Sequence, residues 1–152
     1  MKRSRLKEIR FKTEQGYSVY IPLFCTNTVL LGNSNTGKSY IYNSLKQLAT
    51  DGKLNFECIC FDPDDCTALR NTFRHPFDGL IVLEDFDILR IKFPELVDWL
   101  NNQDHQVLLI GRNLNGVMTY IWYLFEIVNK GKMLGVKPAL SKTEYYEGGY
   151  TK

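Results

Sequence analysis

Short apolar runs alternate with helical patterns along most of the chain. Apolar, β-branched or aromatic runs that are too short for a helix predict strands, and these runs cover residues 6–11, 17–21, 27–32, 55–62, 79–87 and 106–113. Apolar residues that recur every three or four positions predict helices, and these segments cover residues 38–48, 65–73 and 93–103. Strands alternating with helices are typical of a mainly parallel sheet with crossover helices. The predicted fold class is therefore α/β.

Punctuating residues set the expected ends of several elements. The first two strands flank "KTEQG" and stop at Pro22, which predicts an N-terminal β-hairpin over about 6–22. Pro94 stands where the helix expected over 93–103 can begin. Asp64 or Asp65 is available to cap the N-terminus of the helix expected over 65–73.

Length and composition fit a single domain over residues 1–152, since the chain has 152 residues and 44% of them are hydrophobic. We expect its core over about 27–113. The pattern over 114–152 is less clear, and fits a helix, then one or two strands, then an irregular tail.

Charge and cysteine usage exclude little. The net charge of +2 is too small to indicate nucleic acid, which stays open as a partner. No apolar stretch follows the basic residues near the N-terminus, so we predict no membrane anchor and a cytoplasmic location. Cys58 and Cys60 do not have paired zinc-site spacing. On a strand they share one face with Phe56 and are expected to be ordinary core thiols.

The loop between the third strand and the first helix has a phosphate-binding sequence. Residues 32–39 read "GNSNTGKS" and match G-x-x-x-x-G-K-S at every position. Glycines let the backbone curl round an anion, successive amides point inward, and the helix N-terminus adds partial positive charge. The strand before the loop and the amphipathic helix after it provide the structural context that the pattern requires.

With this motif the chain resembles the P-loop NTPases. The resemblance implies a three-layer P-loop fold and a nucleotide-binding core over about 27–113. It also implies that Lys38 reaches the β- and γ-phosphates and that the Ser39 hydroxyl ligates Mg²⁺. The residues expected to bind nucleotide are Gly32, Asn33, Ser34, Asn35, Thr36, Gly37, Lys38, Ser39 and Tyr40.

A second motif lies about 45 residues further on. Four apolar residues, 80–83, are followed directly by Glu84 and Asp85, which resembles a Walker B element. In that element one carboxylate holds the metal and the next orients the attacking water. Two assignments are open. Either Glu84 holds the metal and Asp85 polarises water, or the strand ends one residue later, Asp85 holds the metal and Asp87 is the base. We favour Glu84 and Asp85 acting together.

The two motifs place the chain nearest the division of P-loop ATPases that has an additional strand and a catalytic acid. That division usually has aspartate before glutamate, whereas Glu84 precedes Asp85 here. A polar residue at the tip of the added strand contacts the γ-phosphate in that division, and Arg112 or Asn113 resembles it by position. An arginine there can stabilise charge on the transferring phosphoryl group.

The resemblance implies an ATP-binding protein that uses Mg²⁺, and an ATPase that couples nucleotide binding or hydrolysis to a conformational change. A regulatory module with little or no hydrolysis is the alternative. A small P-loop kinase is less favoured, because Arg90 and Arg112 are isolated and no arginine-bearing lid is present. A GTP-binding protein is also less favoured. The stretch "IVNKGK" resembles the guanine-reading element of GTPases, but Lys132 replaces its aspartate and cannot accept the guanine hydrogen bonds. The lack of an arginine finger implies a protein partner or a homo-oligomer.

Overall fold

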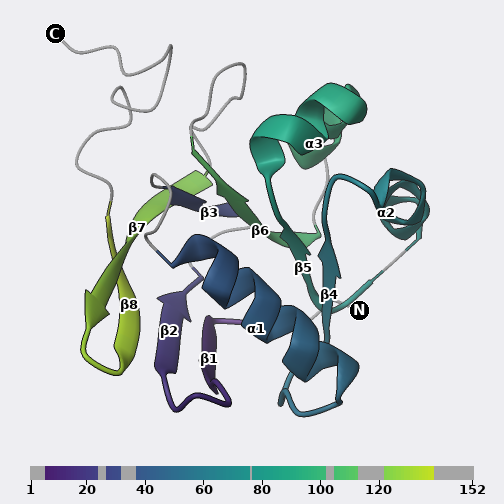
Figure 1. Ribbon diagram of the computed structural model, residues 1–152. Coiled ribbons are helices and arrows are strands. Elements are labelled where there is room, and N and C mark those ends of the chain that lie inside the picture. The colour runs from purple at the N-terminus through teal and green to yellow at the C-terminus, as the bar shows by residue number, and fades with distance from the viewer. Residues whose placement is uncertain are drawn as a thin grey trace, which may run out of the picture.

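The computed structural model describes residues 6–23, 27–31, 37–75, 77–101, 105–112 and 122–138. The strands are β1 (Glu8–Lys12), β2 (Ser18–Pro22), β3 (Asn27–Leu31), β4 (Cys58–Phe61), β5 (Leu80–Leu83), β6 (Gln106–Gly111), β7 (Trp122–Lys130) and β8 (Met133–Pro138). The helices are α1 (Lys38–Thr50), α2 (Cys66–Phe73), α3 (Phe86–Lys92) and α4 (Leu96–Asn101). Figure 1 shows their arrangement.

All these strands form one eight-stranded sheet in the order β1-β2-β8-β7-β3-β6-β5-β4. Strands β7, β3, β6, β5 and β4 are successive parallel neighbours. β1 and β2 form the predicted antiparallel hairpin, and β2 joins the rest of the sheet by parallel pairing with β8. The predicted α/β class is confirmed. The sheet is more mixed than expected, because β7 and β8 form a second antiparallel hairpin.

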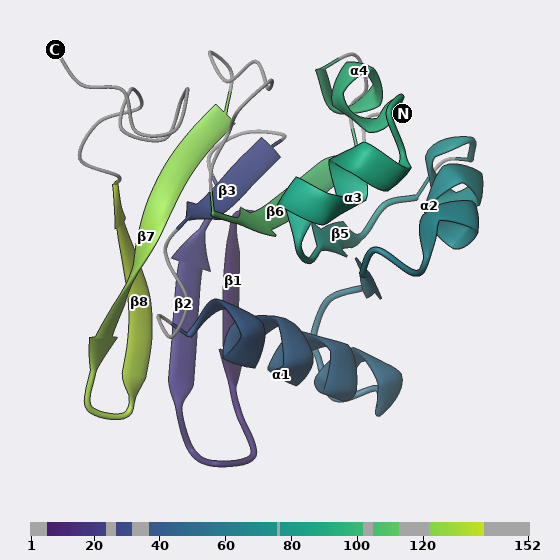
Figure 2. The ribbon, with the colours of Figure 1, turned by 45° about the horizontal axis from the view of Figure 1, so that its top comes forward.

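Side chains of the central strands alternate between two buried faces. Val29, Ile81 and Leu109 pack in one cluster with residues of α2, α3 and α4. The neighbouring residues Leu30 and Leu108 pack in a second cluster with α1. Helices on both faces explain why these strands read as continuous apolar runs in the sequence. Figure 2 shows α1 separated from the group formed by α2, α3 and α4.

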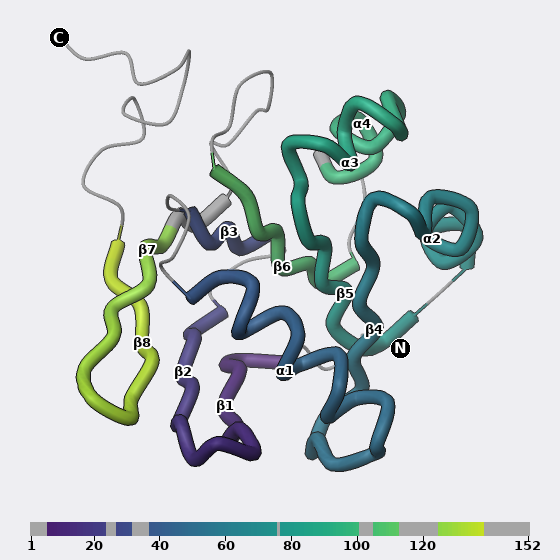
Figure 3. The backbone as a smooth tube through the Cα atoms, viewed as in Figure 1, coloured from purple at the N-terminus to yellow at the C-terminus, as the bar shows by residue number. Residues whose placement is uncertain are grey.

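The sheet is curled, so that the N-terminal hairpin also packs on α1. Ile9 and Ile21 of the hairpin share a buried cluster with Leu45 of α1. The backbone N–H of Leu6 donates to Gln106 Oε1 at 3.0 Å, and Gln106 Nε2 donates back to the Leu6 carbonyl at 2.6 Å. The tube in Figure 3 shows the two hairpins gathered at one end of the sheet, with α2, α3 and α4 around the other.

The predicted strand over 79–87 is wrong in its second half, because β5 ends at Leu83 and α3 begins at Phe86. The Asp85 carbonyl starts this helix by accepting the N–H groups of Ile88 and Leu89, each at 2.9 Å. The sequence pattern missed α3 because Asp85, a non-glycine residue in a left-handed conformation, turns the chain directly from β5 into the helix.

Other boundaries differ by less. Pro94 lies in the turn before α4 and not inside it. Asp65 precedes α2 as predicted, but its carboxylate accepts the N–H of Asp62 at 3.0 Å and makes no cap hydrogen bond to the helix. The two strands expected after residue 113 are β7 and β8, whereas the expected helix before them and the tail fall outside the described residues.

Cys58 and Cys60 share one face of β4 as predicted, and both are partly buried. The Sγ atoms of Cys58 and Cys60 lie 3.9 Å apart on one face, and both residues pack on the same cluster as Phe56. Across the described ranges, no helix has the length and apolar character needed to cross a membrane.

Candidate functional site

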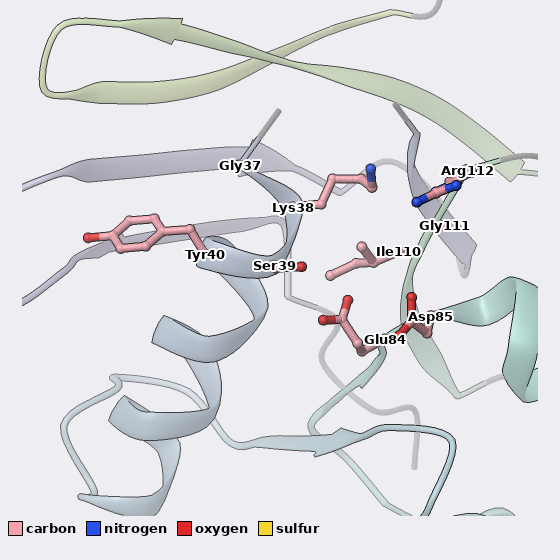
Figure 4. Close-up of a pocket in the computed structure, with 9 residues that line it drawn as sticks. All are labelled: Gly37, Lys38, Ser39, Tyr40, Glu84, Asp85, Ile110, Gly111 and Arg112. Atoms are coloured by element: carbon pink, nitrogen blue, oxygen red, sulfur yellow. The ribbon is translucent and has the colours of Figure 1, made fainter. Parts of the chain in front are cut away.

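A cavity of about 480 Å³ opens at the carboxyl ends of the parallel strands, the edge at which open α/β sheets bind ligands. Its lining comes from the start of α1, the residues after β5 and the end of β6 (Figure 4). The lining residues are Gly37, Lys38, Ser39, Tyr40, Glu84, Asp85, Ile110, Gly111 and Arg112. Segments far apart in the sequence therefore meet here.

The N-terminus of α1 forms one wall. Gly37 precedes the helix with φ 103° and ψ 2°, a backbone conformation that residues with a Cβ atom avoid. Within the part of the chain that the structure describes, a Cβ atom here would meet nothing closer than Ile127 Cγ2 at 3.9 Å, so the glycine reflects backbone conformation more than space. The first turn of α1 contains no acidic residue. The first N–H groups of a helix have no partner within the helix, and its N-terminus carries partial positive charge, so this end of α1 favours an anion in the cavity.

Two cations face this space. Lys38 is the first residue of α1, and Arg112 follows β6. Figure 4 shows the two side chains facing each other on one side of the cavity. The pKa of Lys38 lies below its usual value, first because the side chain is partly buried and second because Arg112 is a nearby positive charge. Glu84, Asp87 and Asp85 oppose this shift. An anion bound between Lys38 and Arg112 would relieve their repulsion.

Two acids face the same space from the end of β5. Glu84 continues the strand, since its N–H donates to the Phe61 carbonyl at 2.9 Å. Burial raises the pKa of the Glu84 carboxyl, and the negative charge of Asp85 raises it further, while the backbone N–H of Asp85 and the charge of Lys38 lower it. A cation bound between the two carboxylates would relieve their repulsion.

The backbone of Asp85 explains how two successive acids reach one cavity. In a continuous strand Glu84 and Asp85 would point to opposite faces. Asp85 has φ 52° and ψ 51°, and it is the one non-glycine residue in the described ranges with positive φ. This left-handed residue ends β5 and turns the chain into α3. Figure 4 shows both carboxylates directed into the cavity, on the side toward which the Ser39 hydroxyl also points.

Asp87, the other candidate base, lies elsewhere. It is in the first turn of α3 and does not belong to the cavity lining. Its Oδ2 atom accepts the backbone N–H of Arg112 at 3.0 Å. Of the three acids considered from the sequence, Glu84 and Asp85 therefore line the cavity and Asp87 does not.

The side chain of Tyr40, a predicted nucleotide-binding residue, points away from the cavity (Figure 4). Its hydroxyl donates to Gln15 Oε1 at 2.6 Å and lies 2.8 Å from Thr13 Oγ1. Its ring also packs edge-on against Tyr17, with centroids 5.5 Å apart. Tyr40 therefore fixes the first turn of α1 to the N-terminal hairpin.

Comparison with protein-family models and with curated protein sequences gives no match. Among solved structures, one similar chain comes from a crystal structure of a DNA replication initiation factor. The identity is 17% and the TM-score 0.40, over 62% of this chain and 36% of that chain. Another belongs to a model of ribosome-bound archaeal Pelota and ABCE1. Here the identity is 10% and the TM-score 0.47, over 95% of this chain and 36% of that chain. The chain thus spans about a third of either structure, and likeness at these TM-scores decides no function.

The structure brings together Gly37, Lys38, Ser39, Glu84 and Asp85 as the sequence predicts, with Arg112 beside them. The predicted loop residues Gly32, Asn33, Ser34, Asn35 and Thr36 lie outside the described residues, as does Asn113. Sequence reasoning missed the contribution of Ile110 and Gly111 and the contact between Asp87 and Arg112. The glycine in "LLIGRN" was the available signal, because glycine at a strand end often marks a close approach.

Proposed function

We propose that this chain binds ATP with Mg²⁺ in the cavity between α1, β5 and β6, and acts as an ATPase. In this proposal nucleotide binding or hydrolysis drives a conformational change. The observation that carries the proposal is the division of charge within one cavity. A pair of cations and a helix N-terminus lie on one side, and a pair of carboxylates lies on the other. A polyphosphate that carries a divalent cation complements both sides at once.

The residues present fit magnesium. Ser39 and the carboxylates of Glu84 and Asp85 are hard oxygen donors, which Mg²⁺ prefers. Among the described residues no group of three or more His, Cys, Asp or Glu could hold a metal. A Mg²⁺ ion usually takes one or two protein carboxylates and completes its coordination with phosphate oxygens and water. When bound, the ion would neutralise phosphate charge.

The chain's own residues then have distinct roles. Lys38 holds the β- and γ-phosphates, and the amides of the first turn of α1 bind phosphate oxygens. Arg112 faces Lys38, and in this proposal it stabilises charge on the terminal phosphate. Of Glu84 and Asp85, one binds the metal and the other orients water.

Strand order supports the same proposal. β6 lies between β3, which leads into the phosphate-binding loop, and β5, which ends in the acids. One strand between the two motif strands is what the resemblance to the additional-strand division of P-loop ATPases implies. The carboxyl ends of β5 and β6 consequently deliver acids and arginine to neighbouring positions.

ATP is favoured over GTP by the position of the "NKGK" stretch. Asn129 and Lys130 end β7, and Gly131 and Lys132 form the turn into β8. Lys132 Nζ donates to the Gln15 carbonyl at 3.1 Å and lies 4.6 Å from the centre of the Tyr17 ring. Lys132 therefore connects the two hairpins, and as a cation it cannot accept the N–H groups of guanine.

A regulatory module that binds nucleotide without rapid hydrolysis is the second candidate. It is favoured by Arg112 being the one arginine in the described cavity lining. A single arginine leaves less compensation for charge that develops during phosphoryl transfer. The same observation disfavours a small kinase, because Arg90 does not line the cavity.

The experiment that separates these candidates measures binding of Mg-ATP and Mg-GTP by calorimetry, with phosphate release followed in the same samples. The proposal predicts ATP binding that needs Mg²⁺, weaker GTP binding and phosphate release above the no-protein control. ATP binding without release would support the regulatory module. Equal binding of the two nucleotides would overturn the assignment of base specificity.

A further inference from the structure

Asp87 connects α3 to the end of β6 without lining the cavity. It is the second residue of α3, and its Oδ2 atom accepts the backbone N–H of Arg112 at 3.0 Å. A hydrogen bond from a backbone amide to a carboxylate is stronger than one between neutral groups. The bond therefore fixes the position at which the chain leaves β6 and Arg112 begins.

Gly111 allows this contact to form. A Cβ atom at Gly111 would lie 3.3 Å from Asp87 Oδ1 and 3.4 Å from Phe86 Cβ. The first distance is tighter than ordinary van der Waals contact and the second is at its lower limit, so a side chain here would require Asp87 to shift by a few tenths of an ångström. The absence of a side chain at Gly111 thus lets the first turn of α3 sit directly against the end of the strand.

The second carboxylate oxygen of Asp87 is a feature that stability by itself would not favour. Oδ1 is buried and has no hydrogen-bond partner among the described residues. A buried carboxylate oxygen without a partner costs free energy, and a neutral side chain in its place would avoid that cost. A residue that the fold holds at such a cost is a candidate for a role in function.

The charge of Asp87 also reaches the other cation of the site. Its negative charge favours the protonated form of Lys38, against the effects of burial and of Arg112. Asp87 thus acts on both cations that face the cavity. It holds the backbone of Arg112 by a hydrogen bond, and it supports the charge of Lys38 through space.

We propose that Asp87 is a positioning residue that holds Arg112 at the end of β6, so that Arg112 can distinguish a nucleoside triphosphate from a diphosphate. This inference rests on the proposed function of the cavity. The helix N-terminus contacts phosphates common to both nucleotides, and Lys38 spans the β- and γ-phosphates. Arg112 is the second cation available to the terminal phosphate, and it is the one that Asp87 holds in place. Asp87 acts through Arg112 and touches no nucleotide itself.

The test compares the affinities of Mg-ADP and a non-hydrolysable Mg-ATP analogue by calorimetry. Asp87→Ala is expected to lose about tenfold of the preference for the triphosphate and to leave diphosphate affinity nearly unchanged. Asp87→Asn is expected to keep most of the preference, because its amide oxygen can still accept the N–H of Arg112. Arg112→Ala should lose the preference, and adding Asp87→Ala to it should cause no further loss.

Several outcomes would overturn the inference. Asp87→Ala weakening both nucleotides equally would indicate a structural role only, and additive losses in the double variant would show that Asp87 does not act through Arg112. If Asp87→Ala does not fold, Gly111→Ala disturbs the same contact from the β6 side and should lose part of the preference. If the wild type binds neither nucleotide, the proposed function fails and this inference fails with it. If Asp87→Ala keeps the wild-type preference for the triphosphate, only the role of Asp87 is overturned and the proposed function stands. Where Asp87→Ala does not fold, the same conclusion follows if Gly111→Ala keeps that preference.

Discussion

Two glycines at opposite ends of α1 offer a matched test of the phosphate-binding role. Gly37 precedes the helix with φ 103°, and Gly52 follows it with φ 68°. Among the described residues, a Cβ atom would meet only Ile127 Cγ2 at 3.9 Å in the first case and nothing within 4 Å in the second. Alanine at either position therefore introduces backbone strain and no steric clash with this part of the chain.

The strain can be given a magnitude. A left-handed residue with a Cβ atom costs about 1–2 kcal/mol, and the reduced freedom of the unfolded chain returns about 0.4–1 kcal/mol. The net loss for Gly37→Ala or Gly52→Ala is then about 1 kcal/mol, which lowers Tm by about 2–4 °C for a chain of this size. Without ligand, the two variants should be destabilised to a similar degree.

Nucleotide should separate the variants. Mg-ATP at about a hundred times its Kd stabilises the folded wild type by about 2.7 kcal/mol, a rise in Tm of about 5–11 °C. Gly52→Ala should show the full rise. Gly37→Ala should lose most of it, because relaxing the strain at residue 37 moves the first amides of α1. The measurement is thermal unfolding with and without Mg-ATP, and equal rises in both variants would refute the reasoning.

Three further predictions concern the acids after β5. Burial and the charge of Asp85 raise the pKa of the Glu84 carboxyl in the folded protein. Ionised Glu84 therefore destabilises the folded state, and the loss of stability develops as the pH rises from the ordinary pKa of a glutamate through the raised pKa. Without Mg²⁺, Glu84→Gln should thus have a higher Tm than the wild type near neutral pH and the same Tm in acid, where the wild-type carboxyl is protonated. A higher Tm that persists in acid would contradict the raised pKa. Asp85→Gly should relieve left-handed strain and stabilise the protein by about 1 kcal/mol without Mg²⁺; a fall in Tm would show that residue 85 is not strained. Glu84→Gln and Asp85→Asn should have different effects: one should weaken Mg-ATP binding measured by calorimetry, and the other should mainly slow phosphate release. If neither variant changes binding or phosphate release, the acids are misassigned.

The sequence predicted the central elements because their signals are local. Continuous apolar runs at β3, β5 and β6 indicate strands buried on both faces, and the stripe containing Ile41, Leu45 and Leu48 indicates the helix α1. The meeting of the α1 N-terminus with the acids of β5 also followed, since both stand at carboxyl ends of parallel strands.

Features that depend on tertiary structure did not follow from the sequence. α3 was hidden because Asp85 adopts a left-handed conformation that ordinarily belongs to glycine. The outward direction of Tyr40 depends on Gln15 and Thr13, which belong to a distant hairpin turn. The bond from Arg112 to Asp87 requires knowing that α3 packs against the end of β6.

Binding of Mg-ATP to the wild type and to Lys38→Ala, measured by calorimetry, tests the central claim most directly. Lys53→Ala is the matched control, because Lys53 is an exposed cation that pairs with Glu14 at 3.9 Å and does not line the cavity. The account predicts Mg²⁺-dependent ATP binding by the wild type and by Lys53→Ala, and loss of that binding in Lys38→Ala. Equal binding by all three proteins, or by none, would contradict it.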